Sequence, residues 1–280
     1  MFPLKKIFKF LTTAFNRWNE HEATSMAASL SYFAIFSIAP LLVMMLGIAG
    51  LVFDQAYVQT QILAYLAALL GAQASTLIGD LLLTQLNPTT SYFALIFGIV
   101  TLILGATGIV GQLQNILNKI WEIPGNKRSG VGYLIKSKIA AVILVFVLAV
   151  LLIVSILLST FVSYLNSYLP LYMAVVPLSD TLLTLFFLTL FFIIVFGYLP
   201  HRKPNLLKVL PGALITAILI FLGKYAVSIY LSSSKSISAF GAASALVILL
   251  LWIYFMSLLI LFGAEITRML EERSTTPATT

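Results

Sequence analysis

Charged residues are scarce in this sequence: they make up only 9% of its 280 residues, whereas 61% are hydrophobic. A typical soluble domain carries about 25% charged residues, and so few charges could not cover the surface of a water-soluble fold. We therefore exclude a soluble protein and expect lipid to be the main solvent. Because a membrane-spanning helix needs about 20 apolar residues, the chain has room for one polytopic membrane domain and no second soluble domain.

Cysteine is absent, and histidine occurs only twice, at His21 and His201. The lack of cysteine excludes disulfides, thiolate catalysis and cysteine-ligated metals. The two histidines lie far apart in sequence, and no HExxH, GxSxG or GxxxxGK[ST] pattern occurs. A magnesium site made of carboxylates alone stays open, although the nine acidic residues are scattered along the chain. We predict a protein that is not an enzyme, with no catalytic residues, metal, cofactor or nucleic-acid partner.

Long apolar stretches are what the chain has in abundance, and six of them can cross a membrane. They predict an all-α polytopic membrane protein, a bundle of six transmembrane helices with the approximate bounds 27–53, 91–111, 139–165, 181–199, 209–231 and 241–266. A seventh apolar stretch, 62–83, is interrupted by polar residues such as Gln73 and Asp80. For that stretch we predict an amphipathic helix or a shallow hairpin on the outer side, between spans one and two.

The distribution of positive charge decides between six and seven spans. With six spans, 14 of the 16 Lys and Arg residues lie on one side of the membrane. Cytoplasmic loops carry the excess of Lys and Arg, so this side is the cytoplasm and both termini lie in it. A seventh span at 62–83 would move the basic cluster at 119–138 to the outside, and we reject it for that reason.

The two ends of the chain flank the six-span domain, which we place at 27–268. Residues 1–26 carry apolar side chains at helical spacing, among them Phe8 and Phe15, with lysines largely elsewhere. We predict a cytoplasmic amphipathic helix that lies along the inner membrane surface; the alternative is a helix packed under the bundle. Residues 269–280 are predicted to be a polar cytoplasmic tail.

Proline and small residues punctuate the spans. Pro40 falls inside the first span and should kink it, and Pro211 opens the fifth span. Small residues are typical of seams where membrane helices pack closely. The residues that we assign to kinks or close packing are Pro40, Gly105, Gly108, Pro211, Gly212 and Gly263. Such seams also allow a homo-oligomer.

One acid, Glu265, follows a long apolar run in the sixth span. An acid at membrane depth usually faces a partner or a wet cavity. Either Glu265 engages a cation, a proton or a headgroup in a polar cavity open to the cytoplasm, or it pairs with Arg268 or the amides of span two. Lys224, near the outer face, should snorkel outward or meet Asp180. The candidate cavity residues are Glu265, Asn118, Asn115, Gln112, Tyr32, Ser31 and Trp121.

Four blocks of the sequence, in order along the chain, resemble motifs of the YihY/BrkB family of bacterial inner-membrane proteins. They are AASLSYFAIFSIAPLL (27–42), LGATGIVGQLQNILNKIW (104–121), LPGALITAIL (210–219) and GAASALVILLLWIYFMSLLILFGAEITR (241–268). The resemblance implies a multi-pass protein of the bacterial inner (plasma) membrane with both ends inside. It marks as characteristic the positions Ser31, Tyr32, Pro40, Asn118, Trp121, Pro211, Gly212, Gly263 and Glu265.

The resemblance also bears on function. The family was formerly mislabelled ribonuclease BN, and its members are linked to serum resistance and to export of envelope lipid precursors. Our leading hypothesis is a protein of the bacterial envelope that transports or flips a lipid precursor or a small solute, with membrane lipids as partners. The alternative is a non-catalytic scaffold for envelope machinery, and a membrane-bound hydrolase or ribonuclease comes last.

Overall fold

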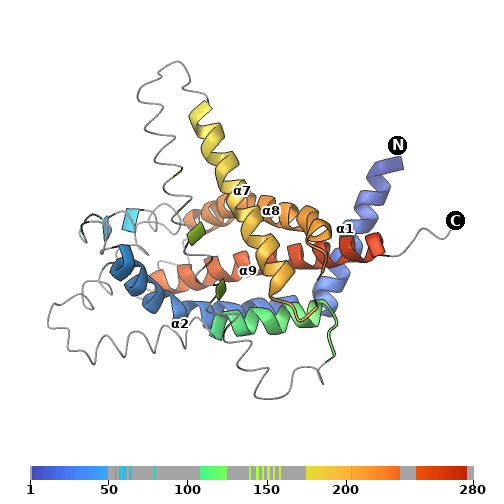
Figure 1. The fold of residues 1–280 in the computed structure, drawn as a ribbon, viewed down its shortest axis with the longest axis horizontal. Helices are drawn as coiled ribbons and strands as arrows, with labels where there is room; N and C mark the ends of the chain where they lie inside the picture. Colours follow the sequence, from blue (N-terminus) through green and yellow to red (C-terminus); the bar gives the residue numbers. More distant parts are fainter. Residues whose placement is uncertain are drawn as a thin grey trace. The chain divides into compact units, whose positions relative to one another are not determined.

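A computed structural model describes residues 2–49, 108–124, 175–202, 204–233 and 244–275, with isolated positions in 54–79 and 139–158, and these residues are helical apart from short turns and connecting segments (Figure 1). The bounded helices are α1 (Phe2–Glu20), α2 (Ala23–Ala49), α7 (Val175–Tyr198), α8 (Leu206–Ser233) and α9 (Ser244–Thr275). Residues 108–120 form a further helix. This part of the chain holds no β-strand, which confirms the predicted all-α class there.

Three of the helices that the structure describes are long and apolar enough to cross a membrane. These candidate spans are Thr181–Tyr198, Leu206–Val227 and Val247–Glu272, and they overlap the spans predicted at 181–199, 209–231 and 241–266. Ala23–Phe36, in α2, is a shorter apolar helix. Most of the predicted spans 91–111 and 139–165, the stretch 62–83 and Gly105 lie outside the described residues. The count of six spans and the side of each terminus stay predictions.

The fifth span begins earlier than the sequence predicts. The Oδ1 atom of Asn205 accepts a hydrogen bond from the backbone N–H of Leu207 at 3.0 Å, and the carbonyl of Asn205 accepts from Lys208 at 2.9 Å. Asn205 therefore caps the first turn of α8, as asparagine commonly does. Pro211 lies inside the helix rather than opening it. The cap, which the apolar pattern cannot show, sets the start of α8.

The chain divides into two compact units. The first unit consists of residues 1–23, 114–221 and 259–280, and the second of residues 24–113 and 222–258.

In the first unit, α8 and α9 meet in a reciprocal seam. A Cβ atom added to Gly212 would lie 2.6 Å from the Cα atom of Thr267, and one added to Gly263 would lie 2.7 Å from the Cβ atom of Thr216. Real Cβ atoms essentially never come that close to another heavy atom. Glycine is therefore needed at both positions, as predicted for Gly212 and Gly263, because it lets the helix backbones approach.

The seam is built by a five-residue sequence that occurs twice in the chain with one difference. Residues 212–216 read Gly-Ala-Leu-Ile-Thr, and residues 263–267 read Gly-Ala-Glu-Ile-Thr. The glycine of each copy faces the threonine of the other, so the helices run antiparallel there. Each threonine hydroxyl donates to the carbonyl of the glycine four residues before it, at 2.8 Å for Thr216 and 2.7 Å for Thr267.

In the second unit, α2 packs against the start of the helix over residues 108–120. A Cβ atom added to Gly108 would lie 3.1 Å from the ring of Phe33, which agrees with its predicted close packing. Nε2 of Gln112 donates to the hydroxyl of Ser29 at 2.7 Å. α2 continues through Pro40 to Ala49. The Nζ atom of Lys224 lies 4.9 Å from the ring centroid of Tyr225.

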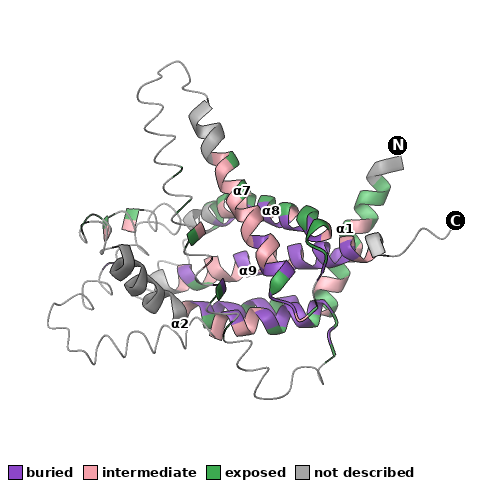
Figure 2. Cartoon of the chain, viewed as in Figure 1, coloured by how far each residue is buried: buried purple, intermediate pink, exposed green. Residues whose placement is uncertain are grey.

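The N-terminal helix α1 packs on the last part of α9. Ala14 is fully buried and forms a cluster with Ile266 and Met269, and the ring of Trp18 meets that of Phe262 edge-on at 6.4 Å. Figure 2 shows buried residues along this part of α9, whereas much of α1 is exposed. One side of α1 is thus packed against α9, and another is open; the predicted position of this helix along the membrane surface stays a prediction.

Candidate functional site

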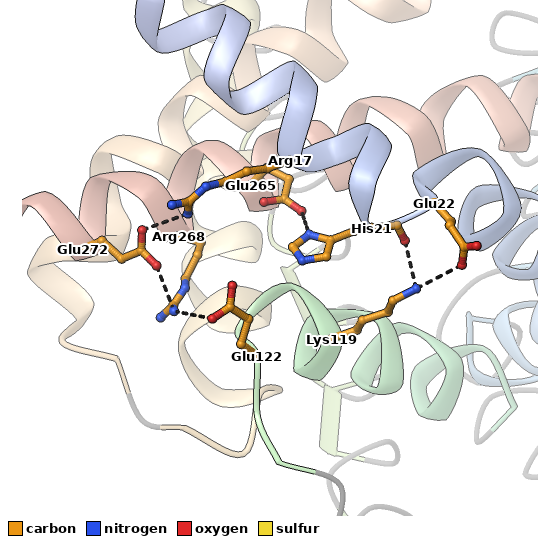
Figure 3. A network of polar contacts seen from close by, with 8 residues as sticks. All are labelled: Arg17, His21, Glu22, Lys119, Glu122, Glu265, Arg268 and Glu272. Atoms are coloured by element: carbon orange, nitrogen blue, oxygen red, sulfur yellow. Dashed lines mark hydrogen bonds and ion pairs between the residues drawn. The ribbon is translucent and has the colours of Figure 1, made fainter.

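The polar residues of the first unit gather where three segments meet. These segments are the turn at residues 21–22 after α1, the end of the helix over residues 108–120, and the last three turns of α9 (Figure 3). α9 itself runs to Thr275, so residues 269–275 of the predicted polar tail are helical. This extension of α9 carries Glu271 and Glu272 into the cluster.

Glu265 is the most deeply buried charged group of this cluster. Only 1% of its surface is exposed, and it lies inside the candidate span Val247–Glu272. Its Oε1 atom lies 2.5 Å from Nδ1 of His21 (Figure 3), whereas its Oε2 atom is buried without a hydrogen-bond partner among the described residues. The side chain of His21 is 20% exposed, so the imidazole lies between the buried carboxylate and the surface.

The local alternative for Glu265, a pair with Arg268, is not what the structure shows. Nη2 of Arg268 lies 2.8 Å from Oε1 of Glu272, one turn further along α9, and 3.8 Å from Oε2 of Glu122. A carboxylate four residues along the same helix face is within easy reach of an arginine. The acid three residues back is bound instead by His21, which the sequence places 244 positions away.

A chain of alternating charges ties α1 to α9. Nη1 of Arg17 donates to Oε2 of Glu272 at 2.8 Å, and Glu272 in turn contacts Arg268. This hydrogen bond raises the pKa of the Arg17 guanidinium above its ordinary value, although partial burial opposes the rise. Arg17 and Glu272 are each about one-third exposed (35% and 34%), so the pair contributes modestly to stability while fixing which part of α9 faces α1.

Two glutamates sit in backbone conformations that side chains rarely adopt. Glu22 has a φ of 58° and Glu122 a φ of 51°. The N–H groups of Glu122 and Ile123 bond to the carbonyls of Lys119 and Asn118, at 3.0 and 2.9 Å. That pattern is a Schellman ending, in which glycine usually takes the left-handed position. Strain of this kind tends to gather at functional sites.

Each of these strained glutamates also meets a basic residue of the cluster. Oε2 of Glu22 lies 3.2 Å from Nζ of Lys119, and the same Nζ donates to the carbonyl of His21 at 3.1 Å. Glu122 contacts Arg268, as described above. Lys119 thereby holds the turn that carries His21, and this positions the imidazole next to Glu265 (Figure 3).

Two amide side chains, Gln114 and Asn118, hold the segment that follows α7. Nε2 of Gln114 donates to the carbonyl of Leu199 at 2.8 Å, and Oδ1 of Asn118 accepts from the backbone N–H of His201 at 3.0 Å. Nδ2 of Asn118 also lies 3.1 Å from Nδ1 of His201. Both amides are buried. They satisfy backbone groups at the end of α7 that the helix itself leaves open.

Trp121, directly after the helix over residues 108–120, also joins the cluster. Its Nε1–H donates to Oε2 of Glu271 at 2.9 Å, and both side chains are buried. Its ring lies 6.1 Å from that of Phe196 in α7. A buried indole usually finds a partner for its N–H, and here the partner is a second buried acid of α9. Glu271, like His21, did not figure among the candidates from the sequence.

The predicted site residues fall into two groups. Glu265, Asn118 and Trp121 belong to the first unit, where the structure brings Glu265 to His21, Asn118 to His201 and Trp121 to Glu271. Asn115 is also in this unit, but it is exposed. The second unit holds Gln112, Ser31 and Tyr32.

The residues of the second unit have local partners. Gln112 bonds to Ser29, and the hydroxyl of Ser31 donates to the carbonyl of Ala27 at 2.7 Å. Tyr32 is 59% exposed, and its ring lies 4.9 Å from that of Phe36. In the described segments, no group of three or more His, Cys, Asp or Glu residues could hold a metal ion.

Comparison with known proteins places this arrangement among membrane proteins. The profile of the family described as "Virulence factor BrkB" matches residues 14–280. The chain is 26% identical over 274 residues to the ribonuclease-like protein YfkH of Bacillus subtilis, covering 96% of this chain and 97% of that one. No solved structure matches the chain.

Other relatives carry the name UPF0761 membrane protein. The one from Aggregatibacter aphrophilus is 27% identical over 268 residues, which cover 94% of this chain and 92% of that one. The one from Actinobacillus pleuropneumoniae is 26% identical over 261 residues, covering 92% of each chain. The similarity thus extends over nearly the whole length on both sides.

Proposed function

The chain belongs to the virulence factor BrkB family of membrane proteins, and on that premise we propose that it transports or flips a lipid precursor or a small solute, with His21 and Glu265 as its proton or cation site. The cargo would enter from the cytoplasmic side of a bacterial inner membrane that the chain crosses several times. No ATP-binding motif occurs in the sequence, so we expect an ion gradient, a partner or passive flow to drive the movement.

The observation that carries this proposal is the burial of Glu265 in an apolar helix. A carboxylate at that depth is costly, and such groups in membrane proteins usually mark ion or substrate paths. One oxygen of Glu265 is bonded to His21, and the other is buried without a partner among the described residues. The carboxylate therefore has an oxygen left with which to bind a proton or a cation.

The exposure of the two side chains gives the site a direction. The side chain of His21 is 20% exposed and that of Glu265 1%, so a proton from solvent reaches the imidazole first. Histidine is the usual residue for handing a proton on near neutral pH. We infer the order solvent, His21, Glu265, with the turn at residues 21–22 held in place by Lys119.

We do not propose a nuclease or another hydrolase. The name of the Bacillus relative refers to ribonucleases, but the acids of this cluster are already bonded to groups of the chain. Glu271 accepts from Trp121, and Glu272 pairs with Arg17 and Arg268. Acids used in this way stabilise helix contacts, whereas a hydrolytic metal site needs several ligands directed at one ion.

The scaffold alternative depends on small-residue seams that join copies of the chain. The clearest seam here, at Gly212 and Gly263, is used within one chain, between α8 and α9. An oligomer would have to use other surfaces. This observation favours transport over the scaffold as the first hypothesis to test.

A proton-flux assay tests the proposed site directly. Purified protein is reconstituted into vesicles that hold a trapped pH-sensitive dye, and a potassium gradient with valinomycin drives proton entry. We expect flux through the wild type, and loss of most of it in Glu265→Gln and in His21→Gln. The matched control is Glu271→Gln, which neutralises a second buried acid of the same helix and should keep its flux.

Two results would overturn the proposed site. One is a wild type that moves no protons above the level of empty vesicles, and the other is a Glu265→Gln variant with undiminished flux. Native mass spectrometry of gently extracted protein addresses the cargo separately. A defined lipid or precursor that is retained by the wild type and lost in Glu265→Gln would identify it, whereas only bulk lipid in both would argue against a cargo site there.

A further inference from the structure

The helix α1 presents three different sides, of which only one is explained by packing. Its packed side carries Phe10, Ala14 and Trp18 against α9. A second side carries lysines at positions 5, 6 and 9, all exposed. The third side is apolar and exposed, so it is the part of α1 that needs an explanation.

The apolar side consists of four large exposed residues: Ile7 is 56% exposed, Phe8 72%, Leu11 43% and Phe15 56%. Ile7, Leu11 and Phe15 follow one another four residues apart, and Phe8 lies three residues before Leu11, so the four form one stripe along the helix. Single exposed apolar residues are ordinary on a protein surface, but a continuous stripe next to charged residues marks an interaction site. The stripe must be covered by something that accepts apolar side chains.

The contact with α9 indicates how deep in the membrane this stripe would lie. α1 touches α9 at Phe262, Ile266 and Met269, in the last turns of the candidate span Val247–Glu272. Figure 1 shows α1 crossing this end of α9 steeply rather than running along it. The ion pair of Arg17 with Glu272 lies at the same level. A helix that crosses a span where it becomes charged lies at the boundary between hydrocarbon and headgroups.

We propose that the apolar stripe of α1 inserts into the headgroup boundary of the membrane, and that its lysines bind anionic lipid headgroups. Charge decides between lipid and a second copy of the chain. A second copy packed on the stripe would leave Lys5, Lys6 and Lys9 on the other side of α1, pointing away from that copy. Anionic headgroups instead neutralise the lysines, as they do for basic amphipathic helices. This inference does not depend on the proposed transport.

The absence of cysteine makes a site-specific test possible in the full-length protein. Phe8→Cys and Asn16→Cys each introduce one thiol at an exposed position of α1, the first in the apolar stripe and the second on the polar side. Each variant is labelled with a polarity-sensitive fluorophore and reconstituted into vesicles of phosphatidylethanolamine and phosphatidylglycerol. Some of the lipids carry a spin label near the headgroup, which quenches a probe at that depth.

We expect strong quenching and a blue-shifted emission for the probe at position 8, and weak quenching for the probe at position 16. Equal quenching at the two positions would overturn the proposal. A blue-shifted probe at position 8 that is shielded from the spin-labelled lipids would overturn it in favour of a second copy, and disulfide-linked dimers of Phe8→Cys would show that copy directly.

The contribution of the lysines has its own test. Replacing Lys5, Lys6 and Lys9 by Gln in the Phe8→Cys background should reduce quenching in vesicles with phosphatidylglycerol. In vesicles of phosphatidylcholine alone the same replacement should have little effect. Unchanged quenching in the vesicles with phosphatidylglycerol would show that the lysines do not bind anionic lipid, and would overturn that part of the proposal. All three side chains are exposed, so these variants should keep the fold.

Discussion

Nδ1 of His21 lies 2.5 Å from Oε1 of Glu265, although 244 positions separate the two residues in sequence. This contact joins the turn after α1 to the buried part of α9. Lys119 also holds this turn, through the carbonyl of His21. Arg17 of α1 bonds to Glu272 of α9. A change in the position of α1 would therefore move His21, which is the only described residue that bonds to the Glu265 carboxylate.

Removing His21 should destabilise the protein through Glu265. His21→Ala leaves a buried carboxylate without its donor, and the loss of such a partner costs about 1–3 kcal/mol. In the double variant His21→Ala with Glu265→Gln, no charge is left unpaired, and much of the loss should be recovered. Thermal unfolding in one detergent measures both effects. A double variant as unstable as the sum of its single changes would contradict a direct interaction between the two groups.

Adding one methyl group to the close contact between α8 and α9 should also destabilise the protein. Gly212→Ala places a Cβ atom 2.6 Å from the backbone of Thr267, and overpacking of this kind costs about 1–3 kcal/mol. Gly111→Ala is the matched control, because a Cβ atom there meets nothing within 4 Å. Alanine should leave that position unchanged or gain up to about 1 kcal/mol of helix propensity. Equal midpoint temperatures of thermal unfolding for the two variants would refute the close approach of α8 and α9.

Two substitutions of the strained Glu122 separate the effect of backbone strain on stability from the effect of charge. Glu122→Gly relieves a φ of 51°, worth about 1 kcal/mol, and loses an ion pair 3.8 Å long whose glutamate is 66% exposed. We expect Glu122→Gly to be as stable as the wild type or more stable. Glu122→Ala keeps the strain and loses the pair, so it should be less stable than the glycine variant. A glycine variant with a lower unfolding temperature than the wild type would show that the charge matters more than the backbone, and one no more stable than Glu122→Ala would contradict the strain.

The ion pair of Arg17 with Glu272 should hold α1 against α9 at alkaline pH. The pKa of Arg17 is raised, and a raised pKa means that the stabilisation is present below the ordinary value and is lost only above the raised one. Both values exceed any working pH. Amide-exchange protection of α1 should thus stay level up to about pH 10 in the wild type.

Lysine at position 17 is the control for this pH dependence. Lysine has an ordinary pKa of about 10.4, so in Arg17→Lys the protection of α1 should fall as the pH approaches 10. Protection factors are compared because they correct for the intrinsic pH dependence of amide exchange. A wild type that loses protection as early as Arg17→Lys would show that the guanidinium does not hold the helix.

The sequence predicted the three long apolar helices that the structure describes as candidate spans, because an apolar stretch of that length leaves few alternatives. It also singled out Glu265, since an acid after an apolar run is conspicuous. The partner of Glu265 could not be predicted, because His21 comes from a distant turn whose position depends on how α1 packs. The start of α8 was missed for a related reason: the Asn205 cap is a local hydrogen bond that an apolar pattern does not contain.

The three amides of span two show how spacing can mislead. Gln112, Asn115 and Asn118 are three residues apart, a spacing typical of neighbours on one side of a helix. A step of three residues falls about 60° short of a full turn, so over two steps the side chains diverge. Asn115 is exposed, whereas Asn118 is buried. The pair that does act together, Gln114 and Asn118, is four residues apart and holds the segment after α7.

The hydroxyls of Thr216 and Thr267 donate hydrogen bonds within their own helices. At these positions the seam between α8 and α9 therefore depends on close packing. Lipid tails are as apolar as the surfaces that meet there, so parting the helices would exchange one set of dispersion contacts for another. Neither hydroxyl would lose its acceptor in the process. The seam between α8 and α9 lies beside Glu265. Its helices can therefore slide or separate at these two residues without leaving an unsatisfied hydroxyl in hydrocarbon.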